Sequence, residues 1–380
     1  MIRIGMDARP LSTPMSGVGR LLHETLLAFS KSTQYEFYLF SHKPIHSSHS
    51  KILHSSNIHW EQGSGFLSKK GGLYFNIQLP FLLKNFNLNL FWGSQQVLPP
   101  FLPKDLPAVL TYCDLVLYLY PSTMRPIARL QQHLFQSYSV KRSSHILSIS
   151  KNTQDDMIAK FDYPSNRASV AYPGIDEKEI ENLLKIKPSE RIKSLGKNYI
   201  LSVSTIEPRK NYSFLLRVFR CLREKNKSNK IKNLKWVIAG KKGWETEEFL
   251  NELMQESKEF NDIIILENLN DSELHHLYKN SGFFWMASHY EGFGIPLLES
   301  LYHKKMAIVS NIPTFEEIGK KGIEYHPVET EFDVQTWAER SLYHLLKKTQ
   351  FKGSIRKFTW KASAEQTGKA FHSVIKNKTL

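Results

Sequence analysis

The chain has 380 residues, of which 41% are hydrophobic and 12% aromatic, which is enough apolar material for two buried cores. Its formal net charge of +15 favours an anionic partner (nucleic acid, an anionic membrane surface or a phosphorylated substrate), although a solvated basic surface fits the charge alone equally well. Two isolated cysteines exclude a disulfide framework, and charged residues at the N-terminus exclude a signal peptide, so we expect a cytoplasmic protein.

Short apolar runs in the first half predict six strands, with helical patterns such as 18–30 and 152–160 between several of them. The strands are expected at 2–8, 35–41, 88–93, 108–112, 145–150 and 168–172. The histidine-rich segment 42–59 has no acidic or cysteine partners, so we expect a solvated loop there rather than a metal site.

The second half repeats this alternation after a segment rich in Lys and Glu, about 174–198, which predicts a helical linker. Six more strands are expected at 199–203, 234–239, 263–266, 283–287, 306–309 and 323–326. Alternating strands and helices imply parallel sheets with helices on both faces. The chain is therefore predicted to be α/β, with two doubly wound domains that bind ligands at the carboxyl ends of their strands.

Two strand ends of the first domain carry candidate site residues. Gly17-Val18-Gly19-Arg20 follows the first strand as a glycine loop, where phosphate or an acceptor can approach the backbone, although such a short pattern also recurs by chance. Asp114 ends another strand. It can anchor a sugar hydroxyl or cap the next helix, and the sequence leaves both alternatives open.

Basic residues follow two strands of the second domain. Ser204 opens a loop that leads to Arg209 and Lys210, which can neutralise a diphosphate, although an unpartnered basic loop is the alternative. Gly240 opens a second basic turn, which is a weak signal alone. The acids Glu316 and Glu317 are expected to cap a helix and occupy its first turn.

Residues 291–299, Glu-Gly-Phe-Gly-Ile-Pro-Leu-Leu-Glu, are the most informative stretch. Gly292 and Gly294 let the backbone approach a ligand, and a helix that begins near Pro296 offers free N–H groups to phosphate. The carboxylates of Glu291 and Glu299, the latter placed in the first helical turn, can accept hydrogen bonds from hydroxyls. An anion-binding backbone with hydroxyl-binding carboxylates indicates a nucleotide sugar.

Together these segments resemble the retaining nucleotide-sugar glycosyltransferases of family 4, which have the GT-B fold of two facing Rossmann-like domains. The match covers nearly the whole chain. Its strongest part is the E-x7-E signature at 291–299. The Pro-Arg-Lys-Asn segment at 208–211 and the glycine loop at 17–20 support it, and further matches lie at 172–176, 271–278 and 358–360. The resemblance implies an acceptor-side domain, 1–180 with a C-terminal helix at 356–380, and a nucleotide-sugar domain, 195–355.

The resemblance also implies roles for individual residues. Arg209 and Lys210 would hold the donor diphosphate, and Glu299 would bind the ribose. Glu291 would contact the donor sugar or lie by the reacting centre. These two basic residues, Glu291 and Asp114 form the implied catalytic set. The other implied donor-binding residues are Gly17, Gly19, Ser204, Gly240, Leu269, Leu274, Gly292, Phe293, Gly294 and Ile295. No metal or separate cofactor is implied, because the GDP- or UDP-linked sugar is itself a substrate.

Three positions depart from the family pattern. Cys113 stands where a histidine is frequent beside the donor sugar, and a thiol cannot replace the hydrogen bonding of an imidazole. Glu267 stands where a glycine is usual before the donor-base loop. Ala287 replaces a common proline, a change we expect to be mild.

The leading hypothesis is transfer of a hexose, with mannose favoured, to a lipid-linked or polysaccharide acceptor in the synthesis of a cell-surface glycan such as lipopolysaccharide or capsule. The basic charge also suits docking to the anionic inner face of the cytoplasmic membrane. The alternative is a non-catalytic member that binds a nucleotide sugar or glycan and supports a partner enzyme. A nucleic-acid partner is not expected, because no recognition signature accompanies the charge.

Overall fold

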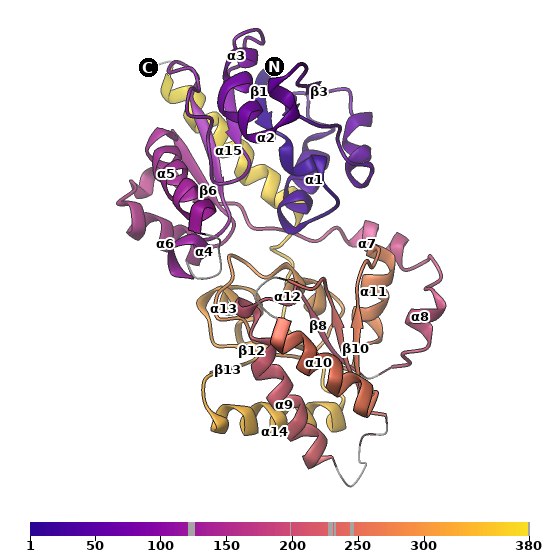
Figure 1. The fold of residues 1–380 in the computed structure, drawn as a ribbon. Helices are drawn as coiled ribbons and strands as arrows, with labels where there is room; N and C mark the ends of the chain where they lie inside the picture. The colour runs from indigo at the N-terminus through magenta and orange to yellow at the C-terminus, as the bar shows by residue number, and fades with distance from the viewer. Residues whose placement is uncertain (121–125, 198, 227–230, 232, 244–246, 379–380) are drawn as a thin grey trace. The chain divides into compact units, whose positions relative to one another are not determined.

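The computed structural model describes residues 1–120, 126–197, 199–226, 231, 233–243 and 247–378 (Figure 1). The chain forms two compact units. The first comprises Met1–Gly174 with Phe358–Leu380, and the second comprises Ile175–Lys357. Each unit has its own parallel sheet flanked by helices, which is the predicted α/β class.

The first unit contains a seven-stranded sheet with the order β3-β2-β1-β4-β5-β6-β7, in which all the pairings are parallel. Its strands are β1 Ile2–Asp7, β2 Tyr35–Ser41, β3 Ile58–Gln62, β4 Leu90–Gly93, β5 Ala108–Tyr112, β6 His145–Ser148 and β7 Ala168–Val170. The six predicted strands are confirmed. Strand β3 was missed, because its sequence, Ile-His-Trp-Glu-Gln, lacks the apolar run of a central strand.

The prediction of a solvated loop at 42–59 is wrong. This segment contains the 3-10 helix η2, Ser47–His54, and the first residues of β3. His49 is fully buried, and its ring lies against that of His23 with centroids 5.4 Å apart. The histidines of this segment therefore contribute to the core as well as to the surface.

Helices α1 (Gly17–Phe29) and α15 (Trp360–Lys378) pack together and against the sheet of the first unit. Leu22, Leu26 and Phe29 of α1 recur at helical spacing and meet Phe371 of α15 in one apolar cluster. The remaining helices of the first unit are α2 Gly71–Leu73, α3 Leu79–Leu83, α4 Val116–Leu119, α5 Pro126–Arg142, α6 Lys151–Phe161, the π-helix η4 Tyr74–Gln78 and the 3-10 helices η1 Arg9–Ser12, η3 Leu67–Lys69 and η6 Ser165–Arg167.

The second unit contains a six-stranded parallel sheet with the order β10-β9-β8-β11-β12-β13. The six predicted strands are confirmed as β8 Ile200–Val203, β9 Trp236–Ala239, β10 Ile263–Leu266, β11 Phe283–Met286, β12 Ala307–Ser310 and β13 Glu324–His326. The helices are α7 Glu177–Leu183, α8 Glu190–Lys193, α9 Tyr212–Lys225, α10 Glu247–Phe260, α11 Asp271–Asn280, α12 Ile295–Tyr302, α13 Pro313–Gly319, α14 Glu331–Lys347 and the 3-10 helices η7 Pro208–Lys210 and η8 Lys320–Gly322.

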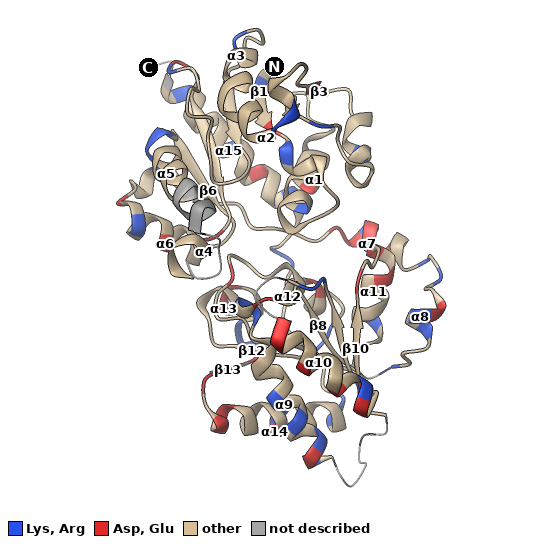
Figure 2. Cartoon of the chain, in the orientation of Figure 1, with Lys and Arg blue, Asp and Glu red and all other residues tan. Residues whose placement is uncertain are grey.

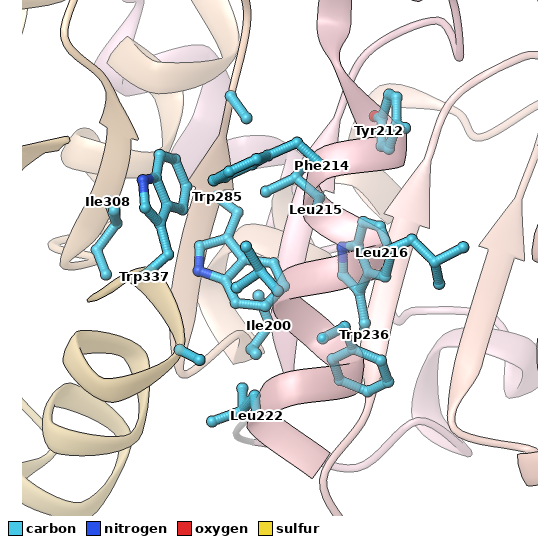
Figure 3. Close-up of a cluster of buried hydrophobic side chains, with 14 of the residues drawn as sticks. Ile200, Tyr212, Phe214, Leu215, Leu216, Leu222, Trp236, Trp285, Ile308 and Trp337 are labelled. Atoms are coloured by element: carbon cyan, nitrogen blue, oxygen red, sulfur yellow. The ribbon is translucent and has the colours of Figure 1, made fainter. Parts of the chain in front are cut away.

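Three fully buried tryptophans form the centre of this unit's core (Figure 3). Trp236 and Trp285 lie on β9 and β11 with ring centroids 5.8 Å apart, and Trp337 comes from α14. The indole N–H of Trp285 donates to Ser341 Oγ at 2.9 Å, so burial leaves no polar atom of the ring unpaired. Helix α9 adds Phe214 to the same cluster. This packing fixes the strands whose carboxyl ends carry the candidate site.

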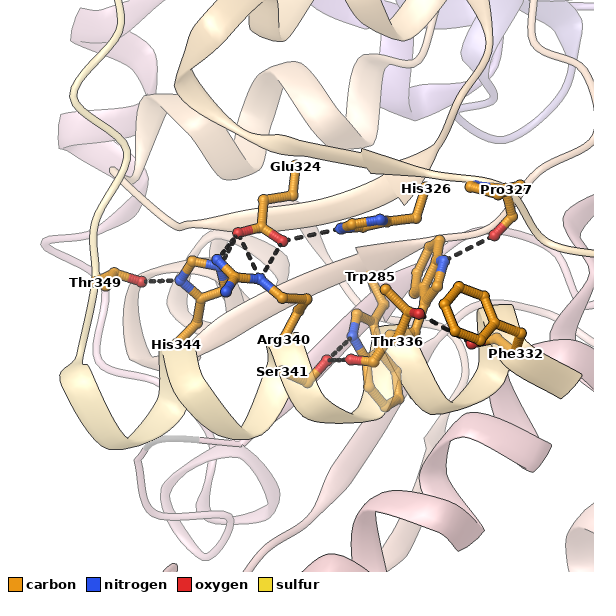
Figure 4. Close-up of polar contacts among 11 residues, drawn as sticks. Trp285, Glu324, His326, Pro327, Phe332, Thr336, Arg340, Ser341, His344 and Thr349 are labelled. Atoms are coloured by element: carbon orange, nitrogen blue, oxygen red, sulfur yellow. Dashed lines mark hydrogen bonds and ion pairs between the residues drawn. The ribbon is translucent and has the colours of Figure 1, made fainter.

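A polar cluster joins the edge strand β13 to α14 (Figure 4). The carboxylate of Glu324 accepts hydrogen bonds from Arg340 Nε at 2.9 and 3.0 Å, from His344 Nε2 at 2.6 Å and from His326 Nε2 at 3.0 Å. Burial alone would raise the pKa of Glu324, but these donors hold the pKa well below its ordinary value.

The segment predicted as a linker lies with the second unit. Arg191 on α8 donates to Glu273 of α11 through Nε at 3.0 Å, and Ser189 Oγ donates to the same carboxylate at 2.6 Å. The hydrogen bond from Arg191 lowers the pKa of Glu273 to about 2. Lys, Arg, Asp and Glu are interspersed on helices such as α8 and α9 (Figure 2). Within the described ranges, no helix has both the length and the apolar character needed to cross a bilayer.

Candidate active site

The predicted donor-binding loops meet at the carboxyl edge of the second unit's sheet. Ser204 follows β8, Gly240 follows β9, and Glu291 lies in the loop after β11. A Cβ at Gly240 would lie 1.8 Å from the carbonyl oxygen of Ser204, so only glycine allows these two loops to approach each other. Because the sheet is parallel, all of these strand ends lie along one edge.

Arg209 and Lys210 lie on the short helix η7, and Asn211 then turns the chain into α9 with a left-handed backbone, φ 54° and ψ 44°. Arg209 donates to the carbonyl of Tyr290 at 2.7 Å and to Glu291 Oε2 at 3.1 Å. Lys210 donates to Glu291 Oε1. The two predicted cations and the predicted carboxylate, 81 positions or more apart in sequence, are therefore in direct contact.

Glu291 is buried and ionised in this arrangement. Its Oε1 also accepts a hydrogen bond from Ser288 Oγ at 2.7 Å. Burial alone would raise the pKa of Glu291, but the charges of Lys210 and Arg209 outweigh it and hold the pKa below its ordinary value. Glu291 thus orients both cations. Its contact with a donor sugar stays a prediction.

Gly294 begins the helix α12 with φ +114°, a conformation that glycine adopts readily and other residues rarely do. Thr314 Oγ1 donates to the carbonyl of Glu291 at 2.8 Å and ties this turn to α13. Gly292 and Phe293, which precede Gly294, are buried in the same turn, and Ile295 is the first residue of the helix.

Glu299 lies in the second turn of α12, one turn later than predicted, because the helix begins at Ile295. Its side chain is on the buried face and the residue is only 5% exposed. Within the described part of the chain, no hydrogen bond or ion pair reaches its carboxylate. Its carboxylate oxygens are not among the fully enclosed polar atoms, so this position suits a ligand that supplies hydroxyl groups.

The predicted base-binding segment follows β10. Leu269 and Leu274 are both half-buried, one in the loop and one on α11. Glu267 directly follows β10, and its Oε1 is enclosed without a donor in the described part of the chain. The sequence analysis missed Arg191, which donates to the carbonyls of residues 267 and 268 at 3.4 and 3.3 Å and steadies this loop.

Gly17 and Gly19 lie in the first turn of α1 rather than in a loop before it, so that part of the prediction is corrected. The helix begins early because Ser16 is extended, at φ −131°, and its side chain accepts the N–H of Gly19 at 3.1 Å. A Cβ at Gly17 would meet nothing within 4 Å, whereas one at Gly19 would press on the ring of His49 at 3.1 Å. The open side of this turn is therefore at Gly17.

Asp114 and Cys113 follow β5 in the first unit. Asp114 Oδ1 accepts the N–H of Val116 at 3.1 Å, so it supports the start of α4. This contact is similar to the helix cap that was one of the two alternatives for Asp114. Cys113 is buried against Leu21 and Trp360, and burial raises the pKa of its thiol. The catalytic role of Asp114 stays a prediction.

Two family models match this chain, one for each half. The model described as Glycosyltransferase Family 4 matches residues 15–179, and the model described as Glycosyl transferases group 1 matches residues 185–353. Together they cover the second unit's sheet and all strands of the first unit's sheet except β1.

Curated relatives are similar over part of their length. The serotype-specific mannosyltransferase WbdA of Escherichia coli is 31% identical over 167 residues, which are 43% of this chain and 20% of that protein. The O-antigen chain mannosyltransferase B of Escherichia coli is 25% identical over 258 residues, 66% of this chain and 64% of its own length. The chain thus spans less than two thirds of each of these relatives.

Solved structures share the fold at low sequence identity. Anabaena Alr3699/HepE in complex with UDP and glucose has a TM-score of 0.68 at 16% identity and covers 98% of this chain and 100% of that one. Sucrose-phosphate synthase from Thermosynechococcus elongatus has a TM-score of 0.68 at 13% identity and covers 99% and 100%. The chain therefore belongs to the glycosyltransferases of the GT-B fold, with a Glycosyltransferase Family 4 first half and a glycosyl transferases group 1 second half.

Proposed function

We propose that the chain is a retaining, metal-independent hexosyltransferase that takes its sugar from a nucleotide diphosphate sugar. The observation that carries this proposal is the pairing of Arg209 and Lys210 on the buried Glu291, beside the glycine-capped start of α12. Two cations and a helix N-terminus can bind a diphosphate, and Glu299 offers an unpartnered carboxylate to the ribose hydroxyls.

The chemistry follows from these charges. As the bond between the sugar and the diphosphate breaks, negative charge develops on the leaving phosphate, and Arg209 and Lys210 stabilise it together with the N–H groups of α12. The acceptor hydroxyl attacks the sugar from the face that the diphosphate leaves, and a leaving phosphate oxygen takes its proton. The configuration at the anomeric carbon is then retained. This role of the two cations replaces the one that a divalent metal fulfils in other transferases.

The donor is proposed to be GDP-linked and mannose-type, in preference to UDP-linked. The relatives described as mannosyltransferases support the sugar. The carboxylate of Glu267 at the end of β10 supports the base, because guanine offers two adjacent N–H donors on its pairing edge and uracil offers one. β10 and β8 are separated by β9 in the sheet, so Glu267 is about 10 Å from the strand that leads to the cations, a span that a nucleotide can cover.

The acceptor is proposed to be a lipid-linked or polysaccharide glycan of the cell surface, such as lipopolysaccharide or capsule. Two relatives are named for O-antigen chains, which supports this class. Such acceptors are elongated at the cytoplasmic face of the membrane, so we place the protein in the cytoplasm and on the inner leaflet.

The alternative is a non-catalytic member that binds a nucleotide sugar or glycan for a partner enzyme. The packing of Cys113 into the core at the position of a frequent family histidine favours this alternative. A single-turnover assay with GDP-mannose and a mannan-type acceptor separates the two. A new glycosidic bond supports the transferase, whereas tight GDP-mannose binding without any product supports the binding protein.

A further inference from the structure

An open hollow of about 760 Å³ lies in the second unit, away from the candidate active site. One wall is the short helix η8, which precedes β13, and the other is the segment 350–354. This segment lies at the start of β12, because the N–H of Phe351 donates to the carbonyl of Lys304 at 3.0 Å. Both walls are therefore at the amino edge of the sheet, whereas the candidate active site is at the carboxyl edge.

The walls of the hollow are held in place by one buried ring. Phe351 is 3% exposed and lies between Gly322 and Gly353. A Cβ at Gly322 would be 2.4 Å from that ring and one at Gly353 would be 2.5 Å away, so both loops are fitted closely to it. The hydroxyl of Tyr325 donates to the carbonyl of Lys320 at 2.7 Å and fixes the turn of η8. The hollow is thus a built feature and not a gap between loose loops.

The hollow carries uncompensated positive charge. Lys320, Lys321 and Lys352 line it with Gln350 and Ser354, and no Asp or Glu is among its lining residues. In the described part of the chain, none of these three amino groups has a carboxylate within 4.0 Å. The pKa of nearby Lys357 is lowered by burial and then by the charge of Lys320, although Glu317 opposes this shift. Lys320 is thus close enough to the ammonium group of Lys357 for the two charges to repel each other.

Lys320 occupies a backbone conformation that side chains disfavour, with φ 48° and ψ −131°. Glycine would adopt it readily, and the lysine at this position is one of the residues that line the hollow.

We propose that this hollow binds a phosphate-bearing ligand. Phosphate oxygens accept hydrogen bonds from several amino groups at once, and the negative charge of a phosphate offsets part of the positive charge of Lys320, Lys321 and Lys352. Gln350 and Ser354 add neutral donors beside them. The same chemistry is offered by a phospholipid headgroup and by a free phosphate ester. The site is independent of the proposed transferase activity, because it lies at the other edge of the sheet.

The test uses the full chain and two matched triple variants. One replaces Lys320, Lys321 and Lys352 with Ala. The control replaces three other exposed lysines, Lys178, Lys187 and Lys258, with Ala, so that both triple variants lose the same charge. Lys320→Gly serves as a further variant that removes the amino group and keeps the turn, so a loss of binding does not reflect misfolding.

Two arms distinguish the ligand's source. In the first, vesicles of phosphatidylglycerol or of phosphatidylcholine are sedimented with each protein. In the second, calorimetry measures binding of glycerol phosphate in the presence of saturating GDP, which occupies the proposed donor site. For a lipid headgroup, the hollow triple variant binds the phosphatidylglycerol vesicles about 100-fold more weakly than the control, since each basic residue near an anionic surface contributes roughly fivefold.

For a free phosphate ester, the hollow triple variant and Lys320→Gly lose the calorimetric signal, while the control triple variant keeps it. Either pattern supports the site, and each identifies one source. Equal binding by the hollow triple variant and the control triple variant in both arms overturns the proposal. The transferase assay is unaffected by that outcome, so the two proposals stand or fall separately.

Discussion

Lys210 and Glu291 form a buried ion pair at the carboxyl edge of the second unit's sheet, with side chains that are 11% and 9% exposed. Arg209 donates to the same carboxylate, so one acid holds two cations in place. A diphosphate at this edge would add negative charge to an arrangement that already has two positive groups positioned. The pair is therefore both a stability element and the proposed anion site, and the two roles can be tested separately.

Replacing Glu291 with Ala leaves the buried Lys210 without its carboxylate, while Arg209 keeps its ion pair with Glu207 at 2.6 Å. We expect the free energy of unfolding to fall by about 3–5 kcal/mol, because an uncompensated buried charge is strongly unfavourable. The double variant Glu291→Leu with Lys210→Met is expected to recover part of this loss. Urea unfolding of the purified proteins measures both values. An unchanged unfolding free energy in Glu291→Ala would show that the pair is not buried as described.

Replacing Glu299 with Gln is expected to separate binding from stability. Its carboxylate has no donor within the described chain, so the melting temperature should stay the same or rise. Nucleotide affinity should fall about tenfold to hundredfold, since a hydrogen bond to a charged group contributes roughly 1.5–3 kcal/mol. Calorimetry with GDP and UDP measures this. Glu316→Gln, an exposed first-turn acid of α13, is the control, and an equal loss of affinity in both variants would contradict the assignment.

Much of the second unit could be predicted, because short segments of its sequence indicate the strands and helices that they form. The strands β8 to β12 are short, mainly apolar runs, and Glu316 lies in a first helical turn, as the sequence indicated. The first unit was harder, since the edge strand β3 mixes polar and apolar residues. The contact between Arg191 and Glu273 could not be predicted, because it joins residues 82 positions apart through a fold that no local pattern reports.

The start of α1 shows a different limit. Two glycines favour a loop by propensity, but the N-cap bond from Ser16 and the packing of the apolar face of α1 outweigh that preference. Similarly, the histidine-rich segment looked solvated because its composition is polar, while His49 is buried and its ring lies against that of His23, which is distant in sequence. Composition does not report which of several polar residues the fold encloses.

Two glycines in the predicted donor set should respond differently to alanine. Gly240→Ala is expected to destabilise the second unit by about 1–3 kcal/mol or more, because the new Cβ would collide with the carbonyl of Ser204. At Gly17 the new Cβ of an alanine would meet open space, and alanine is a good helix former. The free energy of unfolding of Gly17→Ala should therefore stay unchanged. If Gly17 faces the donor, Gly17→Ala lowers the affinity for GDP-mannose and leaves the stability unchanged. Unchanged affinity would remove Gly17 from the donor-binding set.

Replacing Glu267 with Gln tests the proposed base preference. The variant keeps the size of the side chain and loses the charge, so GDP affinity should fall about tenfold while UDP affinity changes little. Calorimetry with GDP and UDP, on the wild type and the variant, gives the ratio of the two affinities for each protein. A wild type that binds UDP more tightly than GDP, or a variant that loses both equally, would contradict a base-reading role for this residue.

Glu324 is expected to govern part of the acid stability. Its folded-state pKa is held below the unfolded value of about 4.3. The contribution of Glu324 to the free energy of unfolding is therefore fully present above that value and is lost as the pH falls through the folded pKa. Wild-type stability should therefore fall from about pH 5 downward. Glu324→Gln should be less stable at neutral pH and show a flatter acid limb.

Urea unfolding across pH 3 to 7 measures this change. Glu339→Gln is the matched control, because Glu339 on α14 forms an exposed ion pair with Lys225 on α9 at 2.9 Å. Such exposed pairs contribute about 0–1 kcal/mol, so this variant should keep the wild-type acid limb. A Glu324→Gln profile that parallels the wild type would show that the β13–α14 cluster does not control the acid response.

The central claim is that this chain transfers a sugar from a nucleotide diphosphate sugar, and a single incubation tests it most directly. The purified protein is mixed with GDP-mannose, a mannan-type acceptor and EDTA, and the product is identified by NMR. The account predicts a new glycosidic bond with the anomeric configuration of the donor, and no product from the Lys210→Ala variant. A wild type that neither binds nor consumes any GDP-, UDP- or ADP-linked sugar would contradict it.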